Sequence, residues 1–337
     1  MQRYTFYLFR LAVSAFFFNF ANVKMKFYLL FVIWYLCSLL PLRVHYLLSD
    51  CIYLVLFYVI GYRRRLVHRH LVDSFPEKSA EEISAIEHRF YHQLCDYFVE
   101  TVKAMTMSEQ QIRRHMVFKG TEDIERCVAE GQSCAVYLGH NFNWEWVTSL
   151  PLWMSERVHF GQLYHALENP EFDHLLLNQR QRWGAQCIAL TDILRVTIEY
   201  KRKNLPTVIG YLGDQVPHWN NIHHWCQFMN HDTPVMTGAE RIIRKNKQAA
   251  FYLEMKKVKR GYYEGEFKLI TRDTHLLEEF ELTDIYFKML EENIRRQPEI
   301  WLWSHNRWKR TREEFDSRFE VVDGKVRERQ TPASAAI

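Results

Sequence analysis

A histidine and a glutamate stand five positions apart in the segment Leu138-Gly139-His140-Asn141-Phe142-Asn143-Trp144-Glu145-Trp146. The pair directly follows an apolar run at residues 134–138. An imidazole can take a proton from an attacking hydroxyl, and a nearby carboxylate can hold the ring in the required orientation. The spacing therefore predicts a general base, His140, and its orienting acid, Glu145.

The local structure around this pair must place both side chains at one point. They cannot share a helical face, because five residues advance about 500° around an α-helix. We therefore expect His140 on the turn after a buried strand, and Glu145 in the first turn of the helix that follows. Cys134 lies within the apolar strand, which favours a buried structural thiol over a nucleophile.

Three other charged residues are candidates for the same site. Arg180 and Arg182 lie near the end of a predicted helix, and on a regular helix they diverge by about 200°, so one of them should face the site. An arginine fork suits a phosphate or a developing oxyanion. The alternative is a solvated basic helix face. Asp214 follows a second buried strand, where α/β sheets present ligand groups; the alternative is a turn aspartate that caps the next segment.

Strands and helices alternate beyond residue 133. The predicted strands are 133–138, 158–164, 206–212, 249–258 and 263–271, and the predicted helices are 170–183, 191–203, 236–247 and 282–296. Ahead of them, Ser79 and Glu82 form a capping box, and apolar residues recur every three or four positions from Ile83 to Met105, with Phe98 among them. This alternation predicts an α/β fold with a sheet covered by helices.

The N-terminal 62 residues form a hydrophobic segment. Apolar runs at 27–42 and 44–62 are each slightly shorter than the ~20 residues that span a bilayer. Arg63, Arg64, Arg65, His68, Arg69 and His70 follow at once, a pattern typical of a membrane anchor with its basic side towards the cytoplasm. The alternative is a buried hydrophobic hairpin. We also hypothesise that translation begins at Met25, after a further apolar stretch at 11–23.

The composition limits the class of protein. The 337 residues suffice for one large domain or two small ones, and a net charge of +4 does not indicate a nucleic-acid partner. The seven cysteines form no CxxC pair, which fits a reducing compartment. The spacing of His223, His224, Cys226, His231 and Asp232 matches no closed zinc site, so we expect a mobile substrate loop there and no metal.

His140-(x)4-Glu145, with Asn143-Trp144 before the glutamate, resembles the motif of the lipid A biosynthesis (lauroyl or myristoyl) acyltransferases. That family lies within the glycerolipid acyltransferase group, which has an HX4D/E motif. Further segments resemble the family in the same order: Tyr62-Arg63-Arg64-Arg65 with Ser74-Phe75-Pro76, Asn169-Pro170 through Arg180-Gln181-Arg182-Trp183-Gly184, Gly210-Tyr211-Leu212-Gly213-Asp214-Gln215, and Trp301-Leu302-Trp303-Ser304-His305-Asn306-Arg307-Trp308-Lys309. Two departures are Asn141-Phe142, where the family often has Phe-Gly, and His70, where an asparagine is common.

The resemblance implies roles for individual residues. It implies that His140, Glu145, Arg180 and Asp214 are catalytic, and that Asn143, Trp144, Arg182 and Gln215 bind substrate. It also implies a glycerolipid-acyltransferase-like sheet and no cofactor. We divide the chain into an anchor at 1–62, a catalytic domain at 63–322 and a disordered tail at 323–337.

The implied reaction moves a fatty acyl group from an acyl carrier protein thioester, or from coenzyme A, to a hydroxyl of a lipid A precursor. It would take place at the bacterial inner membrane, with the catalytic domain facing the cytoplasm. A thioester has a good leaving group, so the reaction needs no covalent enzyme intermediate. The alternatives are O-acylation of another lipid, such as an amino-acid lipid or a lysophospholipid, and a non-catalytic membrane scaffold.

Overall fold

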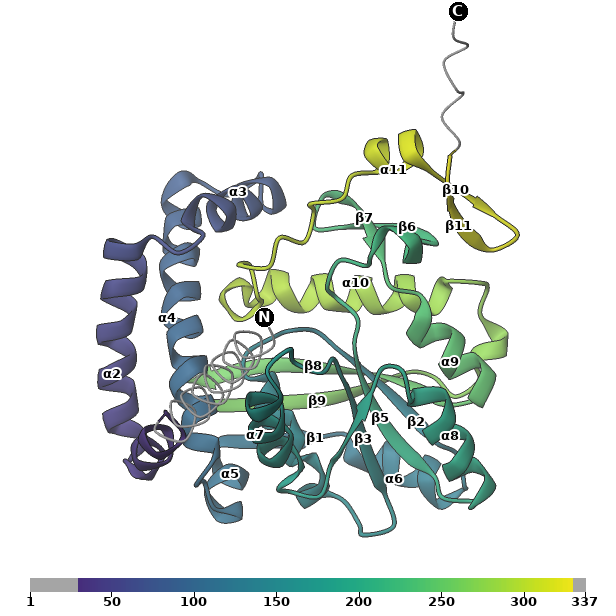
Figure 1. The fold of residues 1–337 in the computed structure, drawn as a ribbon, viewed down its shortest axis with the longest axis horizontal. Helices are drawn as coiled ribbons and strands as arrows, with labels where there is room; N and C mark the ends of the chain where they lie inside the picture. The colour runs from purple at the N-terminus through teal and green to yellow at the C-terminus, as the bar shows by residue number, and fades with distance from the viewer. Residues whose placement is uncertain (1–29, 330–337) are drawn as a thin grey trace, which may run out of the picture.

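A seven-stranded sheet in the order β1-β9-β8-β2-β5-β3-β4 forms the centre of the computed structural model, which describes residues 30–329 (Figure 1). Its strands are β1 (Met116–Lys119), β2 (Cys134–Leu138), β3 (His159–Tyr164), β4 (Gln186–Ala189), β5 (Thr207–Leu212), β8 (Ala249–Lys259) and β9 (Tyr262–Thr271). The strands from β8 to β4 run parallel, and β9 is antiparallel to β8. Met25 and residues 11–23 lie outside the described residues.

Helices cover both faces of the sheet. Alternate residues of β2 show this, because Tyr137 packs in one apolar core and Val136 packs in the other. The covering helices are α5 (Glu109–His115), α6 (Thr121–Ala129), α7 (Pro170–Gln181), α8 (Ile193–Arg202), α9 (Gly238–Asn246) and α10 (Glu281–Arg296). Strands buried on both faces have uninterrupted apolar runs, which is the pattern that predicted β2 and β5. The predicted α/β fold with a helix-covered sheet is confirmed.

The elements β1, α5 and α6 were not predicted from the sequence. Two further expectations need correction. The segment expected to be a mobile loop contains a hairpin of β6 (His224–Phe228) and β7 (His231–Val235). The tail expected to be disordered after Val322 begins with β11 (Lys325–Glu328), which pairs with β10 (Phe319–Val322).

Helix α4 (Ala80–Ala104) begins at the predicted capping box, where the Ser79 hydroxyl accepts the Glu82 N–H and the Glu82 carboxylate accepts the Ser79 N–H. The prediction of one apolar buried stripe is only partly right. Phe98 is 48% exposed, whereas Glu100 is fully buried. The reason is that α4 is covered on more than one side, by the sheet and by an N-terminal helix.

That N-terminal helix consists of α2 (Leu42–Leu54) and η1 (Val55–Ile60), and it lies alongside α4 (Figure 1). Its inward face is partly polar: the Tyr46 hydroxyl donates to Glu100 and the Ser49 hydroxyl donates to Asp96. Its outward face carries the exposed side chains of Val44, Leu47, Leu48, Leu54, Val55, Tyr58 and Val59. A core helix or a buried hairpin would place these apolar side chains inside.

The boundary that sequence analysis put between residues 62 and 63 falls within a continuous packing arrangement. Tyr53 and Phe57 from the N-terminal helix belong to the same apolar core as Tyr137 of β2. After Ile60 the chain turns at Gly61 and enters α3 (Arg64–Ser74). Residues 42–62 therefore pack as part of the body that carries the site.

Candidate functional site

The site forms where β2 and β5 end. These parallel neighbours are paired in register, with Leu138 opposite Leu212, so the residues that follow leave the sheet side by side. The turn after β2 is tight, because a Cβ added to Gly139 would lie 2.5 Å from Cδ1 of Leu290. This arrangement brings His140 and Asp214 together.

Asp214 is buried and accepts three hydrogen bonds. Its Oδ1 lies 2.5 Å from His140 Nδ1, and its Oδ2 accepts the His140 backbone N–H at 2.9 Å and the Trp301 indole N–H at 2.8 Å. Burial alone would raise the pKa of Asp214, but the His140 ring and these hydrogen bonds lower it to about 2. An ionised Asp214 requires the proton of His140 on Nδ1, which leaves the lone pair of Nε2 free to accept a proton.

Gln215 lies directly in front of that lone pair. Its Nε2 is 3.1 Å from Nε2 of His140, and the geometry fits donation from the amide to the ring. The Trp144 ring meets the imidazole edge-on, with 5.1 Å between centroids. An incoming hydroxyl would therefore take the place of the Gln215 amide at Nε2.

The expectation that Glu145 orients His140 is wrong. Asp214 and Gln215 take both ring nitrogens, while the Glu145 carboxylate accepts from Arg180 Nε at 2.8 Å and from Arg180 Nη2 at 2.5 Å. Glu145 does lie in the first turn of a 3₁₀ helix, η2 (Trp144–Trp153), whose N-cap is Asn143. From that turn its side chain reaches α7 instead of the end of β5.

The Glu145–Arg180 pair forms a second, partly buried charged group. The side chains are 6% and 24% exposed, respectively. Burial lowers the pKa of Arg180, but the hydrogen bonds and the charge of Glu145 outweigh this and raise it. Within residues 30–329, Nη1 of Arg180 has no hydrogen bond, so this nitrogen is the part of the fork that can meet a ligand.

Arg182 points elsewhere. Its Nη1 donates to the carbonyl of Ala104 at the end of α4, and its guanidinium lies over the Trp183 ring. The structure therefore brings together His140, Asp214 and Gln215, and separately Glu145 and Arg180, but it does not direct Arg182 to either group.

A family model described as bacterial lipid A biosynthesis acyltransferase matches residues 20–310. This span includes every residue of the site. The chain belongs to this family. It is an acyltransferase, and the resemblance noted in the sequence is confirmed. No match to a curated protein was found.

The Asn141-Phe142 departure from the usual acyltransferase pattern has a structural role in this family member. Asn141 forms a bridge with Trp301, and its Nδ2 donates to Asn293 at 3.0 Å. The buried Phe142 ring stacks on Trp144 and packs beside Tyr97. These contacts attach the His140 turn to α10, to α4 and to the C-terminal segment.

Trp301 is a site residue to which no individual role was assigned from the sequence. It is buried, and its N–H donates to Asp214. A buried indole N–H needs a hydrogen-bond partner, and this requirement was the available signal. His305 lies close by, where its Nε2 accepts the Val216 N–H at 3.3 Å.

The histidines and acidic residues of the β6–β7 hairpin do not converge. His224 pairs with Asp284 at 2.8 Å, and His231 stacks on Trp308. Across the part of the chain that the structure describes, no group of three or more His, Cys, Asp or Glu side chains could hold a metal ion.

Replacement of Asp214 by Asn should lower the rate of acyl transfer on the order of 10³- to 10⁴-fold, because it removes the charge that holds the proton of His140 on Nδ1. Steady-state turnover of the folded variant measures this. The control is Asp232→Asn, which removes only a surface partner of Arg312 and should leave turnover unchanged. Near-normal turnover of folded Asp214→Asn would contradict this assignment of Asp214.

The same carboxyl should give a pH-dependent stability. Its pKa of about 2 lies below the ordinary 3.8, so its stabilising effect is complete above pH 3.8 and is lost as the pH falls towards 2. The difference in melting temperature between wild type and Asp214→Asn should shrink over this interval. A difference that stays constant would contradict the lowered pKa.

Proposed function

We propose that this acyltransferase moves a fatty acyl group from an acyl carrier protein thioester to a hydroxyl of a lipid A precursor. The observation that carries the proposal is the Asp214–His140 pair, which leaves Nε2 of His140 as a base at the point where β2 and β5 end. The chain's membership of the lipid A biosynthesis family supports the acceptor class.

The reaction needs only one proton carrier. The acceptor hydroxyl displaces Gln215 and gives its proton to His140 Nε2 as its oxygen attacks the thioester carbonyl. The C–S bond of the tetrahedral intermediate then breaks, and the imidazolium returns the proton to the leaving sulfur. Asp214 stabilises the imidazolium between these steps, and general base catalysis of this kind is typically worth ~10²–10⁴-fold.

Arg180 has the charge to stabilise the intermediate. The carbonyl oxygen becomes an oxyanion, which a fixed cation in a water-poor site stabilises strongly. Glu145 uses Nε and Nη2 of the guanidinium, so the carboxylate fixes the plane of the fork and leaves Nη1 for the ligand. In this proposal Glu145 orients Arg180, and Asp214 orients His140.

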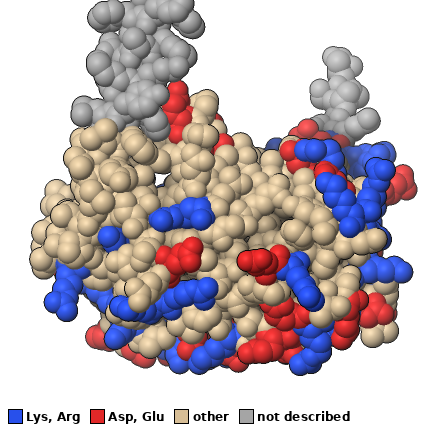
Figure 2. All heavy atoms as spheres, turned by 90° about the horizontal axis from the view of Figure 1, so that it is seen from below, with Lys and Arg blue, Asp and Glu red and all other residues tan. Residues whose placement is uncertain are grey.

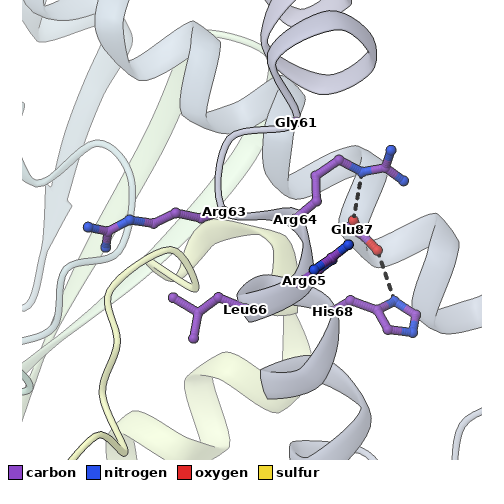
Figure 3. A pocket seen from close by; sticks show the side chains of 7 residues that line it. All are labelled: Gly61, Arg63, Arg64, Arg65, Leu66, His68 and Glu87. Atoms are coloured by element: carbon purple, nitrogen blue, oxygen red, sulfur yellow. Dashed lines mark hydrogen bonds and ion pairs between the residues drawn. The ribbon is translucent and has the colours of Figure 1, made fainter.

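A basic pocket offers a contact for the acidic carrier protein. A cavity of about 660 Å³ is lined by Gly61, Arg63, Arg64, Arg65, Leu66, His68 and Glu87. Figure 3 shows how these side chains lie. Arg64 and His68 flank Glu87, whereas Arg63 points the other way and donates to the Ser304 carbonyl, near Trp301. On the face seen in Figure 2, Lys and Arg are interspersed with Asp and Glu, so a local pocket is a better candidate than a whole face.

The apolar face of α2 and η1 is proposed as the membrane contact. By length and composition alone, Leu42–Ile60 could cross a membrane. If this helix spanned the membrane, α4 would lie in the hydrocarbon core as well. The ion pairs of Arg260 with Asp50 and Asp96 would lie there too, where charged groups are costly. We therefore propose that this helix lies on the inner membrane, parallel to its surface, with the catalytic body on the cytoplasmic side.

Lipid analysis of a deletion strain tests the proposed acceptor. Mass spectrometry should show lipid A lacking one acyl chain, and the chain should return on complementation with wild type but not with folded His140→Ala. An unchanged lipid A together with the loss of another acylated lipid would contradict the proposed acceptor. Full complementation by His140→Ala would instead point to a scaffold.

Replacement of Arg180 by Ala should lower kcat by roughly 10²-fold, because it removes the cation at the developing oxyanion. Arg195→Ala is a matched control, since Arg195 forms an exposed ion pair with Asp192 on α8 and should be dispensable for turnover. Unchanged kcat in folded Arg180→Ala would remove Arg180 from the mechanism.

Spin labels on the outward face of α2 and η1 should report equal, shallow depths in vesicles of anionic lipid. The positions are Val44→Cys and Val59→Cys, made one at a time in full-length protein without its other cysteines. They are fifteen residues apart, so a spanning helix would separate their depths by about 22 Å. A label at Glu199→Cys, exposed on α8, should remain in water. Depths that differ by the full helical rise would contradict the surface orientation.

A further inference from the structure

Helix α4 touches both sides of the Glu145–Arg180 pair. On one side, Oε2 of Glu100 accepts the Asn143 amide at 2.9 Å, and Asn143 caps the helix that carries Glu145. On the other side, the carbonyl of Thr101 accepts the side-chain amide of Gln179 at 3.0 Å, next to Arg180. Consecutive residues of one helix therefore contact the two segments that hold the pair.

Glu100 is fully buried at the junction of four elements. Its carboxylate accepts from the Tyr46 hydroxyl of α2 at 3.0 Å, from the Tyr263 hydroxyl of β9 at 2.9 Å, and from Asn143. Tyr263 in turn accepts from Gln93 on α4, so its own proton is free to point at Glu100. No ion pair joins Glu100 to a cation within residues 30–329.

The carboxylate determines which way the Asn143 amide faces. The Tyr46, Tyr263 and Asn143 groups all donate to Glu100, so its oxygens act as acceptors and meet the Nδ2 end of the amide. The Oδ1 end is then turned to the Glu145 backbone N–H, which it accepts at 3.1 Å. Since both side chains are fully buried, no water competes for these bonds. The first turn of η2, and with it the Glu145 carboxylate, depends on this orientation.

The charge at this position is costly for folding. Burial and the neighbouring charge of Asp96 raise the pKa of Glu100 to about 7. A neutral side chain of the same size would avoid that cost while filling the same space. A costly charge beside a reactive site is more readily explained by a role in the site than by packing.

We propose that Glu100 is a positioning residue for acyl transfer: through Asn143 it fixes the start of η2, and thereby the Glu145 carboxylate that aims Arg180. Tyr46 extends the same hydrogen-bond chain to the helix proposed to lie on the membrane. The inference rests on the proposed function, because Arg180 must act on the reacting carbonyl for its aim to matter.

Kinetics of Glu100→Ala and Glu100→Gln test the proposal. The Ala variant should lower kcat by about 10- to 100-fold with little change in KM, because it misplaces a group needed in the transition state. The Gln variant keeps one acceptor oxygen for Asn143 but loses the charge and adds a donor, so its kcat should lie between those of the Ala variant and the wild type. Asn143→Ala breaks the same link from its other end and should match the Ala variant, so the test survives if Glu100→Ala does not fold.

Glu240 provides the matched control. It is also a buried carboxylate, but it accepts from Thr283 and from the Phe280 N–H at the start of α10, away from the site. Glu240→Ala should reduce the melting temperature and leave kcat unchanged. Wild-type kcat in folded Glu100→Ala or in Asn143→Ala would overturn the proposal, and so would an equal fall of kcat in Glu240→Ala.

A measurement without substrate separates this inference from the proposed function. In a double-mutant cycle of melting temperatures, Glu100→Ala and Asn143→Ala should lose less together than the sum of their separate losses, because each removes the same hydrogen bond. Additive losses would overturn the positioning role whatever the substrate. If the losses are coupled but the protein transfers no acyl chain to a lipid A precursor, the link between Glu100 and Asn143 is supported and only the proposed function is contradicted.

Discussion

The arrangement of the site depends on one buried carboxylate, Asp214. It accepts hydrogen bonds from the backbone and the ring of His140 and from the indole of Trp301, so it joins the ends of β2 and β5 to the C-terminal segment. A buried charge is tolerated only where its hydrogen bonds are complete, and these three offset its burial strongly enough to keep its pKa near 2. The same bonds determine which nitrogen of His140 keeps its lone pair. The hydrogen bonds of Asp214 therefore both hold the site together and set the protonation of the His140 ring.

Helix α4 provides the second constraint. It lies between the N-terminal helix and the site, and its buried polar side chains contact both: Asp96 accepts from Ser49, and Glu100 accepts from Tyr46 and Asn143. The N-terminal helix turns Tyr46 and Ser49 inward, together with the buried rings of Tyr53 and Phe57, and its outward face is apolar. An exposed apolar face suits a helix that covers a protein on one side and meets lipid on the other. The proposed membrane contact and the segment that carries Glu145 therefore both pack on α4.

Much of this fold could be predicted from the sequence, because the determinants are local. The apolar runs of β2 and β5 and the capping box at Ser79 depend on neighbouring residues. Parallel neighbouring strands then bring His140 and Asp214 to one edge. The partner of Glu145 could not be predicted this way, since its direction depends on Asn143 and on Glu100, which is distant in sequence. The exposure of Phe98 and the burial of Glu100 were missed because periodicity assumes one buried face, whereas α4 is covered on more than one side.

We propose that His140, held by Asp214, is the base that takes the proton of a lipid A hydroxyl during acyl transfer. The most direct measurement incubates purified full-length protein with a lipid A precursor and a series of acyl carrier protein thioesters of different chain length, and follows the products by mass spectrometry. Wild type should add one acyl chain and show a clear preference among the thioesters, and folded His140→Ala should lose product on the order of 10²–10⁴-fold. Equal product from His140→Ala would contradict the role of His140, and a wild type that acylates another lipid hydroxyl but not the precursor would contradict the proposed acceptor.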